Sequence, residues 1–255
     1  MIITDTHTHL YSESFDEDRK AMIERAIQSG VKRFFLPAID ASYTDSMLSL
    51  KKQYPHEVFL MSGLHPTHVK ANYKEELAHV SSQLKTGAYV GVGEIGIDLY
   101  WDKSTLKIQQ DAFREQIQWA LNYDLPFVIH CRDAFDEVFE ILDEFKGCSI
   151  KGIFHCFTGT HEQALRALNL NMLLGIGGVV TFKNGKIDQF LSQIPLESIV
   201  LETDAPYLSP APYRGKRNES GYITHVLKKV AELYNKTELE IANITTKNAT
   251  QLFNI

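Results

Sequence analysis

The 255-residue chain contains few cysteines, no long apolar run and no excess of positive charge. Its three cysteines, Cys131, Cys148 and Cys156, include no Cys-x-x-Cys pair, which argues against a disulfide framework and fits free thiols in a reducing cytosol. The longest apolar run, residues 172–180, is interrupted by glycines and is far too short to cross a bilayer. The formal net charge of −6 argues against a protein that coats nucleic acid or a membrane through bulk positive charge, although it leaves room for a local basic patch.

A secretory signal is also missing. No charged segment, apolar segment and cleavage site precede the first apolar strand, so we expect the fold to begin at residue 2. We therefore expect a soluble, cytoplasmic protein that acts as a monomer. Its length suits one α/β barrel, which typically takes about 250 residues, and we predict a single domain over residues 1–255.

Apolar segments typical of buried strands alternate with amphipathic segments typical of helices along the whole chain. The predicted strands are residues 2–5, 31–37, 58–63, 89–93, 127–130, 152–155, 172–175 and 199–201. The predicted helices are 16–29, 77–84, a long one after Lys103, 133–145, 164–168, 187–194, 223–233 and 239–253. Such alternation indicates a (β/α)8 TIM barrel. A doubly wound open sheet is the alternative, but no Gly-x-Gly-x-x-Gly turn follows any predicted strand.

Polar residues stand at the carboxyl ends of the predicted strands, where a barrel builds its active site. His7 and His9 are one residue apart in an extended segment, so their side chains point the same way and form half of a metal site. The other polar residues at strand ends are Glu94, His130, His155 and Asp204. Because buried imidazoles and carboxylates are costly without partners, we expect these side chains to converge.

Four imidazoles and two carboxylates are too many ligands for one tetrahedral ion, but they suit two ions that share a ligand. Glu94 is the predicted bridge, because a carboxylate has two oxygens whereas a neutral imidazole has one free lone pair. The predicted ligands are His7, His9, Asp204 and Glu94 for one ion, and Glu94, His130 and His155 for the other. The candidate ions are magnesium, manganese and zinc.

Seven motifs occur in order along the chain: Asp-Thr-His-Thr-His-Leu at 5–10, Gly-Leu-His-Pro at 63–66, Gly-Glu-Ile-Gly-Ile-Asp at 93–98, Ile-His-Cys-Arg-Asp-Ala at 129–134, His-Cys-Phe-Thr-Gly at 155–159, Val-Val-Thr-Phe-Lys at 179–183 and Leu-Glu-Thr-Asp-Ala-Pro-Tyr-Leu at 201–208. This series resembles the signatures of the TatD family of metal-dependent hydrolases and deoxyribonucleases. The resemblance implies a TIM barrel of the amidohydrolase type, a two-metal site, a cytoplasmic location and hydrolysis of phosphodiester bonds in DNA. One departure is Ser220, where family members often carry proline after an Arg-Gly-Lys-x-Asn-Glu segment, and it concerns the shape of that loop.

The acidic residues near the site have alternative roles. Asp204 is predicted to bind metal and to accept the proton of the nucleophilic water, although it is also placed to cap a turn. Glu202 either faces the same site or anchors a ligand residue. Asp98 either orients a ligand histidine or caps a turn, and the turn is favoured. Asp5 lies two residues before His7, so in a strand the two side chains point to the same face. Asp5 is therefore a candidate to support a metal ligand from behind.

Substrate contacts are predicted at the mouth of the barrel. His65 either contacts the substrate or a metal-bound water, or it shapes the turn after the third strand. Three cationic residues lie in the segment 214–217, after the last strand. Barrels often bind phosphate in the loops at this position. The alternative is that the segment is an ordinary solvated loop. Arg132 is a further candidate unless it pairs with Asp133. The predicted substrate-binding residues are therefore His65, Arg132, Arg214, Lys216 and Arg217.

Two cysteines, Cys131 and Cys156, directly follow predicted ligands and suggest a thiol nucleophile. Because neighbouring strand residues point to opposite faces, we expect both thiols to point away from the site, toward the helices. No Gly-x-Ser-x-Gly sequence is present to supply a serine nucleophile.

The combined prediction is a hydrolase that uses two metals to cleave phosphodiester bonds in DNA, acting from strand ends or on single strands. The alternatives are an amide or ester hydrolase with the same site, such as an aminoacyl-tRNA deacylase, and a scaffold without catalysis. The predicted metal ligands suit the nuclease and the amide or ester hydrolase equally well. The basic loop and the family resemblance favour a substrate that contains phosphate. A non-enzyme would have no need to keep all six predicted ligands.

Overall fold

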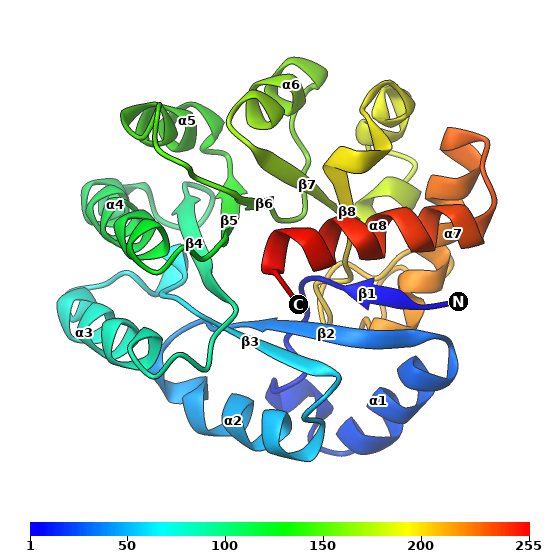
Figure 1. The fold of residues 1–255 in the computed structure, drawn as a ribbon, viewed down its shortest axis with the longest axis horizontal. Coiled ribbons are helices and arrows are strands. Elements are labelled where there is room, and N and C mark those ends of the chain that lie inside the picture. Colours follow the sequence, from blue (N-terminus) through cyan, green and yellow to red (C-terminus); the bar gives the residue numbers. More distant parts are fainter.

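The computed structural model describes residues 1–255 and contains one sheet of eight parallel strands in the order β1 to β8. Figure 1 looks along the barrel and shows the strands at the centre with helices around them. The strands are β1 (Ile3–Asp5), β2 (Val31–Pro37), β3 (Val58–Ser62), β4 (Gly91–Asp98), β5 (Phe127–Arg132), β6 (Gly152–Phe154), β7 (Met172–Ile176) and β8 (Ile199–Leu201). The helices are α1 (Arg19–Gln28), α2 (Thr44–Gln53), α3 (Tyr73–Leu84), α4 (Leu106–Asn122), α5 (Phe135–Glu144), α6 (His161–Asn169), α7 (Ile223–Tyr234) and α8 (Glu238–Phe253).

The barrel closes between its first and last strands through backbone hydrogen bonds. The N–H of Thr6 donates to the carbonyl of Leu201 at 3.0 Å, and the N–H of Asp204 donates to the carbonyl of His7 at 2.9 Å. Thr8 and Ala205 form a parallel bridge just beyond the strands. The predicted (β/α)8 barrel is therefore confirmed, and its seam lies beside residues that the sequence marks as functional.

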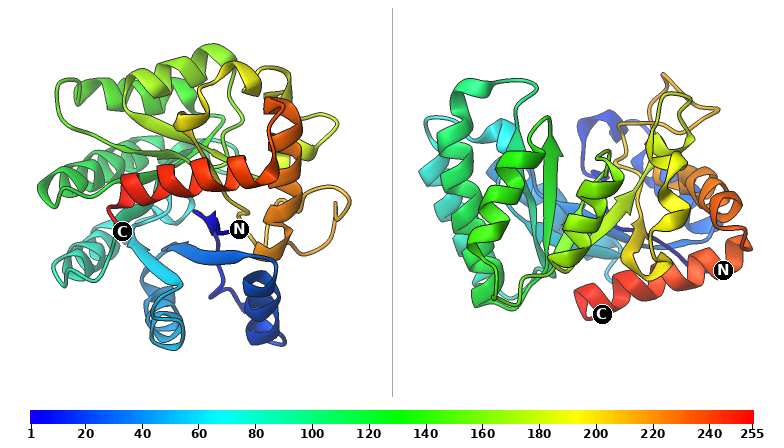
Figure 2. Two further views of the ribbon diagram at one scale, coloured as in Figure 1. Left: turned by 45° about the vertical axis from the view of Figure 1, so that its right-hand side comes forward. Right: turned by 90° about the horizontal axis from the view of Figure 1, so that it is seen from above.

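The amino-terminal end of the barrel is closed by α8. Figures 1 and 2 show this last helix lying across the end of the strands. Its residue Phe253 packs against Phe35 of β2, with ring centroids 4.2 Å apart. Both belong to a small apolar cluster with Met61, Val128 and Ile153, which come from three other strands. Apolar side chains therefore fill the barrel at this end, so a cavity can open only toward the carboxyl ends of the strands.

Most predicted elements are present, but three differ. The predicted helix 187–194 consists of two short 3₁₀ helices, Ile187–Gln189 and Leu191–Gln193. Helix α2 was not predicted, because its only buried residues are Met47 and Leu50 and the remaining positions give little apolar pattern. Strand β4 continues to Asp98, beyond the predicted end at residue 93, because residues 94–98 are buried and residues 95–98 still pair with β5. No helix combines the length and the apolar character that a membrane crossing requires.

Candidate metal centre

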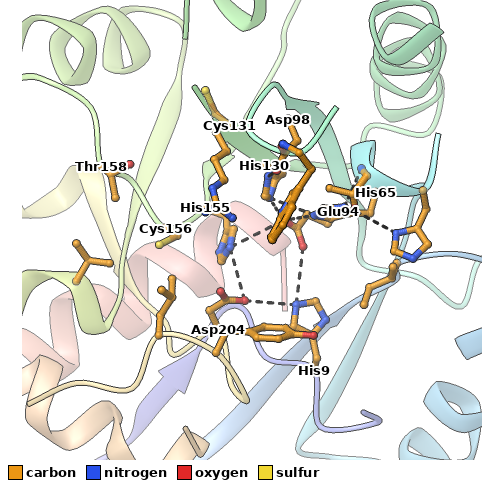
Figure 3. Close-up of a pocket in the computed structure, with 18 residues that line it drawn as sticks. His9, His65, Glu94, Asp98, His130, Cys131, His155, Cys156, Thr158 and Asp204 are labelled. Atoms are coloured by element: carbon orange, nitrogen blue, oxygen red, sulfur yellow. Dashed lines mark hydrogen bonds and ion pairs between the residues drawn. The ribbon is translucent and has the colours of Figure 1, made fainter. Parts of the chain in front are cut away.

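All six predicted metal ligands come together at the carboxyl ends of the strands. Figure 3 shows most of them around a cavity of about 690 Å³. They come from β4 and β5 and from the segments that directly follow β1, β6 and β8. Among the residues that line the cavity are His9, Glu94, His130, His155 and Asp204.

One half of the centre is formed by the segment after β1. The Nε2 atoms of His7 and His9 are 3.3 Å apart, which confirms that the two rings face the same region. His7 Nε2 lies 3.1 Å from Oε2 of Glu94 and 3.7 Å from Oδ1 of Asp204. His9 Nε2 lies 3.4 Å from the same oxygen of Asp204. Two imidazoles and two carboxylates thus direct their donor atoms at one point.

The other half lies around the second oxygen of Glu94. Oε1 of this carboxylate is 2.9 Å from Nδ1 of His130 and 3.3 Å from Nε2 of His65. His155 Nε2 lies 3.9 Å from it, and also 3.7 Å from Oδ1 of Asp204. The two oxygens of Glu94 therefore face different sets of histidines, as a bridging ligand requires.

The grouping of the histidines differs in detail from the sequence prediction. Residues whose donor atoms all lie within 4.8 Å of one another form three groups: His7, His9 and Glu94; His7, His155 and Asp204; His65, Glu94 and His130. The ring of His155 stacks on His7 with centroids 3.4 Å apart, and its Nε2 also faces Glu94 Oε1, so His155 lies between the two halves. His65 occupies the place beside His130 and Glu94 and also lines the cavity. Its Nδ1 also accepts a hydrogen bond from the backbone N–H of Thr67 at 3.2 Å, so its position fits both the site role and the turn role.

Each of four histidines directs its other ring nitrogen at a polar group. The distances are 2.7 Å from His9 Nδ1 to Tyr11 Oη, 2.8 Å from His130 Nε2 to Asp98 Oδ2, 3.0 Å from His155 Nδ1 to Glu202 Oε1 and 2.7 Å from His65 Nδ1 to Thr67 Oγ1. Such partners fix the orientation of a ring and are typical of metal-binding histidines. Glu202 thus contacts the ring of His155, as the anchoring alternative expects.

Asp98 fulfils both of the roles that the sequence left open. Its Oδ2 faces His130, while its Oδ1 accepts hydrogen bonds from the backbone N–H groups of Tyr100 and Trp101, at 3.0 and 3.1 Å. Tyr11 was not predicted, although its hydroxyl holds His9 and donates to the carbonyl of Pro37. In the sequence, only the spacing of two residues from His9 pointed to this role of Tyr11. An aromatic residue at that position is equally typical of the apolar core.

Asp5 connects the two chain segments that meet at the seam. It is fully buried and accepts hydrogen bonds from the backbone N–H and the hydroxyl of Thr203, at 3.0 and 2.6 Å. It also accepts one from the N–H of His7 at 3.4 Å. Burial raises the pKa of Asp5 to about 7, against the effect of the bond from Thr203. Asp5 therefore holds the backbone of two ligand segments and does not contact the histidine rings.

The carboxylates of the centre are ionised at neutral pH. Burial alone would raise the pKa of Glu94, but the charges of the neighbouring histidines, His65 first, outweigh it and hold that pKa well below its usual range. The pKa of Asp204 is also lowered, because the charge of His155 helps to outweigh burial. In turn, Glu202 and the other carboxylates overcome the burial of His155 and raise its pKa to about 10. The buried site therefore attracts positive charge.

These donors fit divalent metal ions. Imidazole nitrogens suit zinc, manganese and similar ions, and carboxylate oxygens suit magnesium and manganese as well. The donor atoms are buried or half-buried, close together and oriented by second partners. A cation bound among these donors would balance the negative charge of the carboxylates. Without it, protonated histidines must supply the positive charge.

The predicted substrate-binding cations lie in two different environments. Arg132 lines the cavity, with its guanidinium 3.7 Å from the ring centroid of Tyr100, and it makes no ion pair with Asp133. Arg217 instead pairs with Asp18 beside α1, at 2.7 and 2.8 Å. Arg214 stacks on Phe182 at 3.5 Å. Lys216 is exposed, and none of the loop cations lines the cavity. Phosphate binding by this loop stays a prediction.

Both Cys131 and Cys156 are among the residues that line the cavity, which strand alternation does not predict. Cys131 also packs against the apolar core, as expected for a core thiol. Cys156 lies beyond the end of β6 and has a φ of 44°, so the strict alternation of a strand does not apply to it. Burial raises the pKa of Cys131 and of Cys156 well above the ordinary thiol value, which makes both poor nucleophiles.

Comparison with known proteins decides the family. Residues 4–254 match the family model described as TatD related DNase. The chain belongs to the TatD family of metal-dependent hydrolases. A relative in Bacillus subtilis, the uncharacterized metal-dependent hydrolase YabD, is 39% identical, with all of both chains covered. The 3'-5' ssDNA/RNA exonuclease TatD of Pectobacterium parmentieri is 30% identical, over 98% of this chain and 99% of its own.

A solved structure of the same family agrees with the fold. The crystal structure of YjjV, a TatD homologue from Escherichia coli, superimposes with a TM-score of 0.92 and 31% identity. The superposition covers 99% of this chain and 98% of YjjV. The resemblance to the TatD family, and the barrel that it implies, are therefore confirmed.

Proposed function

We propose that this TatD-family hydrolase cleaves phosphodiester bonds in DNA with two divalent metal ions, from strand ends or on single strands. The observation that carries the proposal is the position of Glu94. Its two oxygens face two sets of histidines inside one cavity, which supports two neighbouring ions with a shared carboxylate. Two-ion sites of this kind are common in phosphatases and nucleases.

We assign one ion to the ligands His7, His9, Glu94 and Asp204, and the other to Glu94, His130 and His155, with His65 beside the second. When bound, such ions would make water acidic and offset negative charge on a phosphate. Asp98 and Glu202 hold the rings of His130 and His155 in place, through contacts of 2.8 and 3.0 Å. The identity of the metal is magnesium, manganese or zinc.

Asp204 is the proposed proton acceptor. It lines the cavity, and its lowered pKa keeps the carboxylate ionised and ready to accept a proton at neutral pH. In the proposed reaction, water loses a proton to Asp204 as its oxygen bonds to phosphorus. The bond from phosphorus to the leaving oxygen breaks in the same displacement, and this oxygen keeps the electron pair and takes up a proton from solvent.

The size of the cavity supports a small part of a nucleic acid as the bound group. A volume of about 690 Å³ is within the range of small-molecule sites and suits one or a few nucleotides. The net charge of −6 supports recognition through a few placed cations and metals. The name of the Pectobacterium relative, a ssDNA/RNA exonuclease, agrees with this choice. The cytoplasmic location and the monomeric state stay predictions from the sequence.

The test compares substrates on one preparation. Protein reconstituted with manganese or zinc is incubated with end-labelled single-stranded DNA, the matching duplex and an aminoacyl ester. We expect shortened DNA products that a chelator abolishes and that Asp204→Asn reduces strongly. Hydrolysis of the ester, with DNA left intact under all metal conditions, would refute the nuclease and favour the ester hydrolase.

A further inference from the structure

Two large aromatic side chains are exposed beside the metal centre. Tyr100 and Trp101 follow β4 after Leu99 and have 54% and 70% of their surface exposed. Their rings meet edge to face, with centroids 4.9 Å apart. Trp101 also lines the cavity. Single exposed apolar residues are common, but two adjacent exposed aromatics beside a cavity offer ring faces on which a planar ligand can stack.

Arg132 completes this surface from the neighbouring strand β5. Its guanidinium lies 3.7 Å from the centroid of Tyr100 and 5.6 Å from that of Trp101. No carboxylate forms an ion pair with Arg132, in contrast to Arg217, which is held by Asp18. The positive charge of Arg132 is therefore available to a ligand, and its plane adds to the aromatic surface.

One carboxylate connects this surface to the metal centre. Oδ1 of Asp98 accepts the backbone N–H groups of Tyr100 and Trp101, while Oδ2 contacts Nε2 of His130. The N–H of Leu99 donates to the carbonyl of Arg132 at 3.0 Å, which joins the loop to β5. The backbone of the aromatic pair is thus fixed relative to the ligands, so little ordering is needed when a ligand binds.

We propose that Tyr100, Trp101 and Arg132 form a base-stacking subsite for the nucleotide next to the scissile phosphate. The inference rests on the proposed nuclease function and names how that substrate is held. Aromatic side chains stack on any base, because every base has a π-face, and the guanidinium of Arg132 contacts the adjoining phosphate. The subsite tolerates any sequence but requires unpaired bases, since bases in a duplex already stack on one another.

Binding can be measured without catalysis, because the chain contains two tryptophans, Trp101 and Trp119. Trp119 is half-buried in α4 and packs against the apolar core. Trp119→Phe therefore leaves Trp101 as the only indole reporter. In the presence of a chelator, we expect oligothymidylate to quench its fluorescence to saturation, and an abasic oligomer of equal length to quench it much less. The matched variant Trp101→Phe, which keeps Trp119, should show no such difference.

The kinetic test uses the same two oligonucleotides with metal present. Stacking of one base on an aromatic side chain predicts that Trp101→Ala raises KM for oligothymidylate about 5- to 150-fold. The rise for the abasic oligomer should be much smaller, and Trp101→Phe should recover most of the loss. Tyr123→Ala, which removes an exposed aromatic residue after α4 at the other end of the barrel, is the control and should change neither KM.

The results separate this inference from the proposed function. If the wild type cleaves both oligonucleotides and Trp101→Ala weakens both equally, with no quenching of Trp101, the subsite is refuted and the nuclease stands. If no nucleic acid is cleaved under any metal condition, the proposed function fails. Base-dependent quenching of Trp101 would then still support a nucleotide-binding surface.

Discussion

At the amino-terminal end of the strands, apolar side chains under α8 fill the barrel, whereas imidazoles and carboxylates meet at the carboxyl end. Phe253 closes the first end by packing on Phe35, and Glu94 is the centre of the second. The first end lowers its free energy by excluding water from apolar surface. The second keeps buried charges that stabilise the fold little and become favourable only with partners. We therefore expect mutations at the two ends to affect different measurements.

The largest effect is expected from Asp204→Asn. The amide keeps the size and one oxygen but cannot accept a proton, so kcat should fall by about 10²- to 10⁴-fold. The melting temperature should change little, because Asp204 is not part of the apolar packing. Steady-state kinetics on single-stranded DNA and a thermal melt measure the two quantities. If Asp204→Asn keeps the kcat of the wild type, another residue must accept the proton.

The opposite behaviour is expected from Phe253→Ala. Removing a large buried aromatic residue leaves a cavity and typically costs about 3–5 kcal/mol of unfolding free energy. Urea unfolding monitored by circular dichroism measures this loss. Below the melting transition, metal affinity should match that of the wild type. A large loss of metal from folded Phe253→Ala would show that the two ends are coupled.

Asp98→Ala should act mainly at the carboxyl end. It removes the partner of His130, and loss of such a partner typically lowers metal affinity by about 10- to 100-fold. Metal titration in the presence of a competing chelator dye measures the affinity. Asp102→Ala is the matched control, because Asp102 caps a nearby exposed turn and does not line the cavity. Equal affinities of the two variants would exclude a positioning role for Asp98.

The smallest effect is expected from the ion pair of Arg217 with Asp18, which lies in the loops at the carboxyl end but outside the cavity. The hydrogen bond from Arg217 lowers the pKa of Asp18 to about 2, so the pair stabilises the fold above the ordinary pKa of an aspartate. This contribution is lost as pH falls from about 4 toward 2, and for an exposed pair it is below about 1 kcal/mol. Comparing the unfolding free energies of wild type and Arg217→Ala at pH 7 and pH 2.5 should show a larger difference at pH 7 than at pH 2.5. A large rise in KM for DNA in this variant would instead support phosphate binding by Arg217.

The sequence was sufficient to predict the barrel and the polar residues that meet at its carboxyl end, because both follow from local pattern. Alternation of strands and helices predicts the fold, and polar residues at strand ends identify His7, His130 and Asp204 without any knowledge of their contacts. Helix α2 and the second half of β4 were missed where apolar residues are sparse or where glycines suggest the end of a strand.

Contacts between distant residues were not predictable in this way. Arg217 is 199 residues away from its partner Asp18, and no local pattern indicates that the loop rests on α1. The two roles of Asp98 also depend on tertiary structure, because each of its oxygens serves a different neighbour. The left-handed backbone of Cys156 ends the alternation on which its predicted orientation depended.

The most direct test of the account is the number of metal ions bound per chain before and after the loss of Glu94. Wild-type protein, Glu94→Ala and the surface control Glu197→Ala are reconstituted with zinc, freed of excess metal and measured by elemental analysis, with circular dichroism to confirm folding. We predict two ions per chain in the wild type and the control, and loss of both from folded Glu94→Ala, because this carboxylate supplies a ligand to each ion. A folded Glu94→Ala protein that retains two ions, or a wild type that binds only one, would contradict the bridged centre.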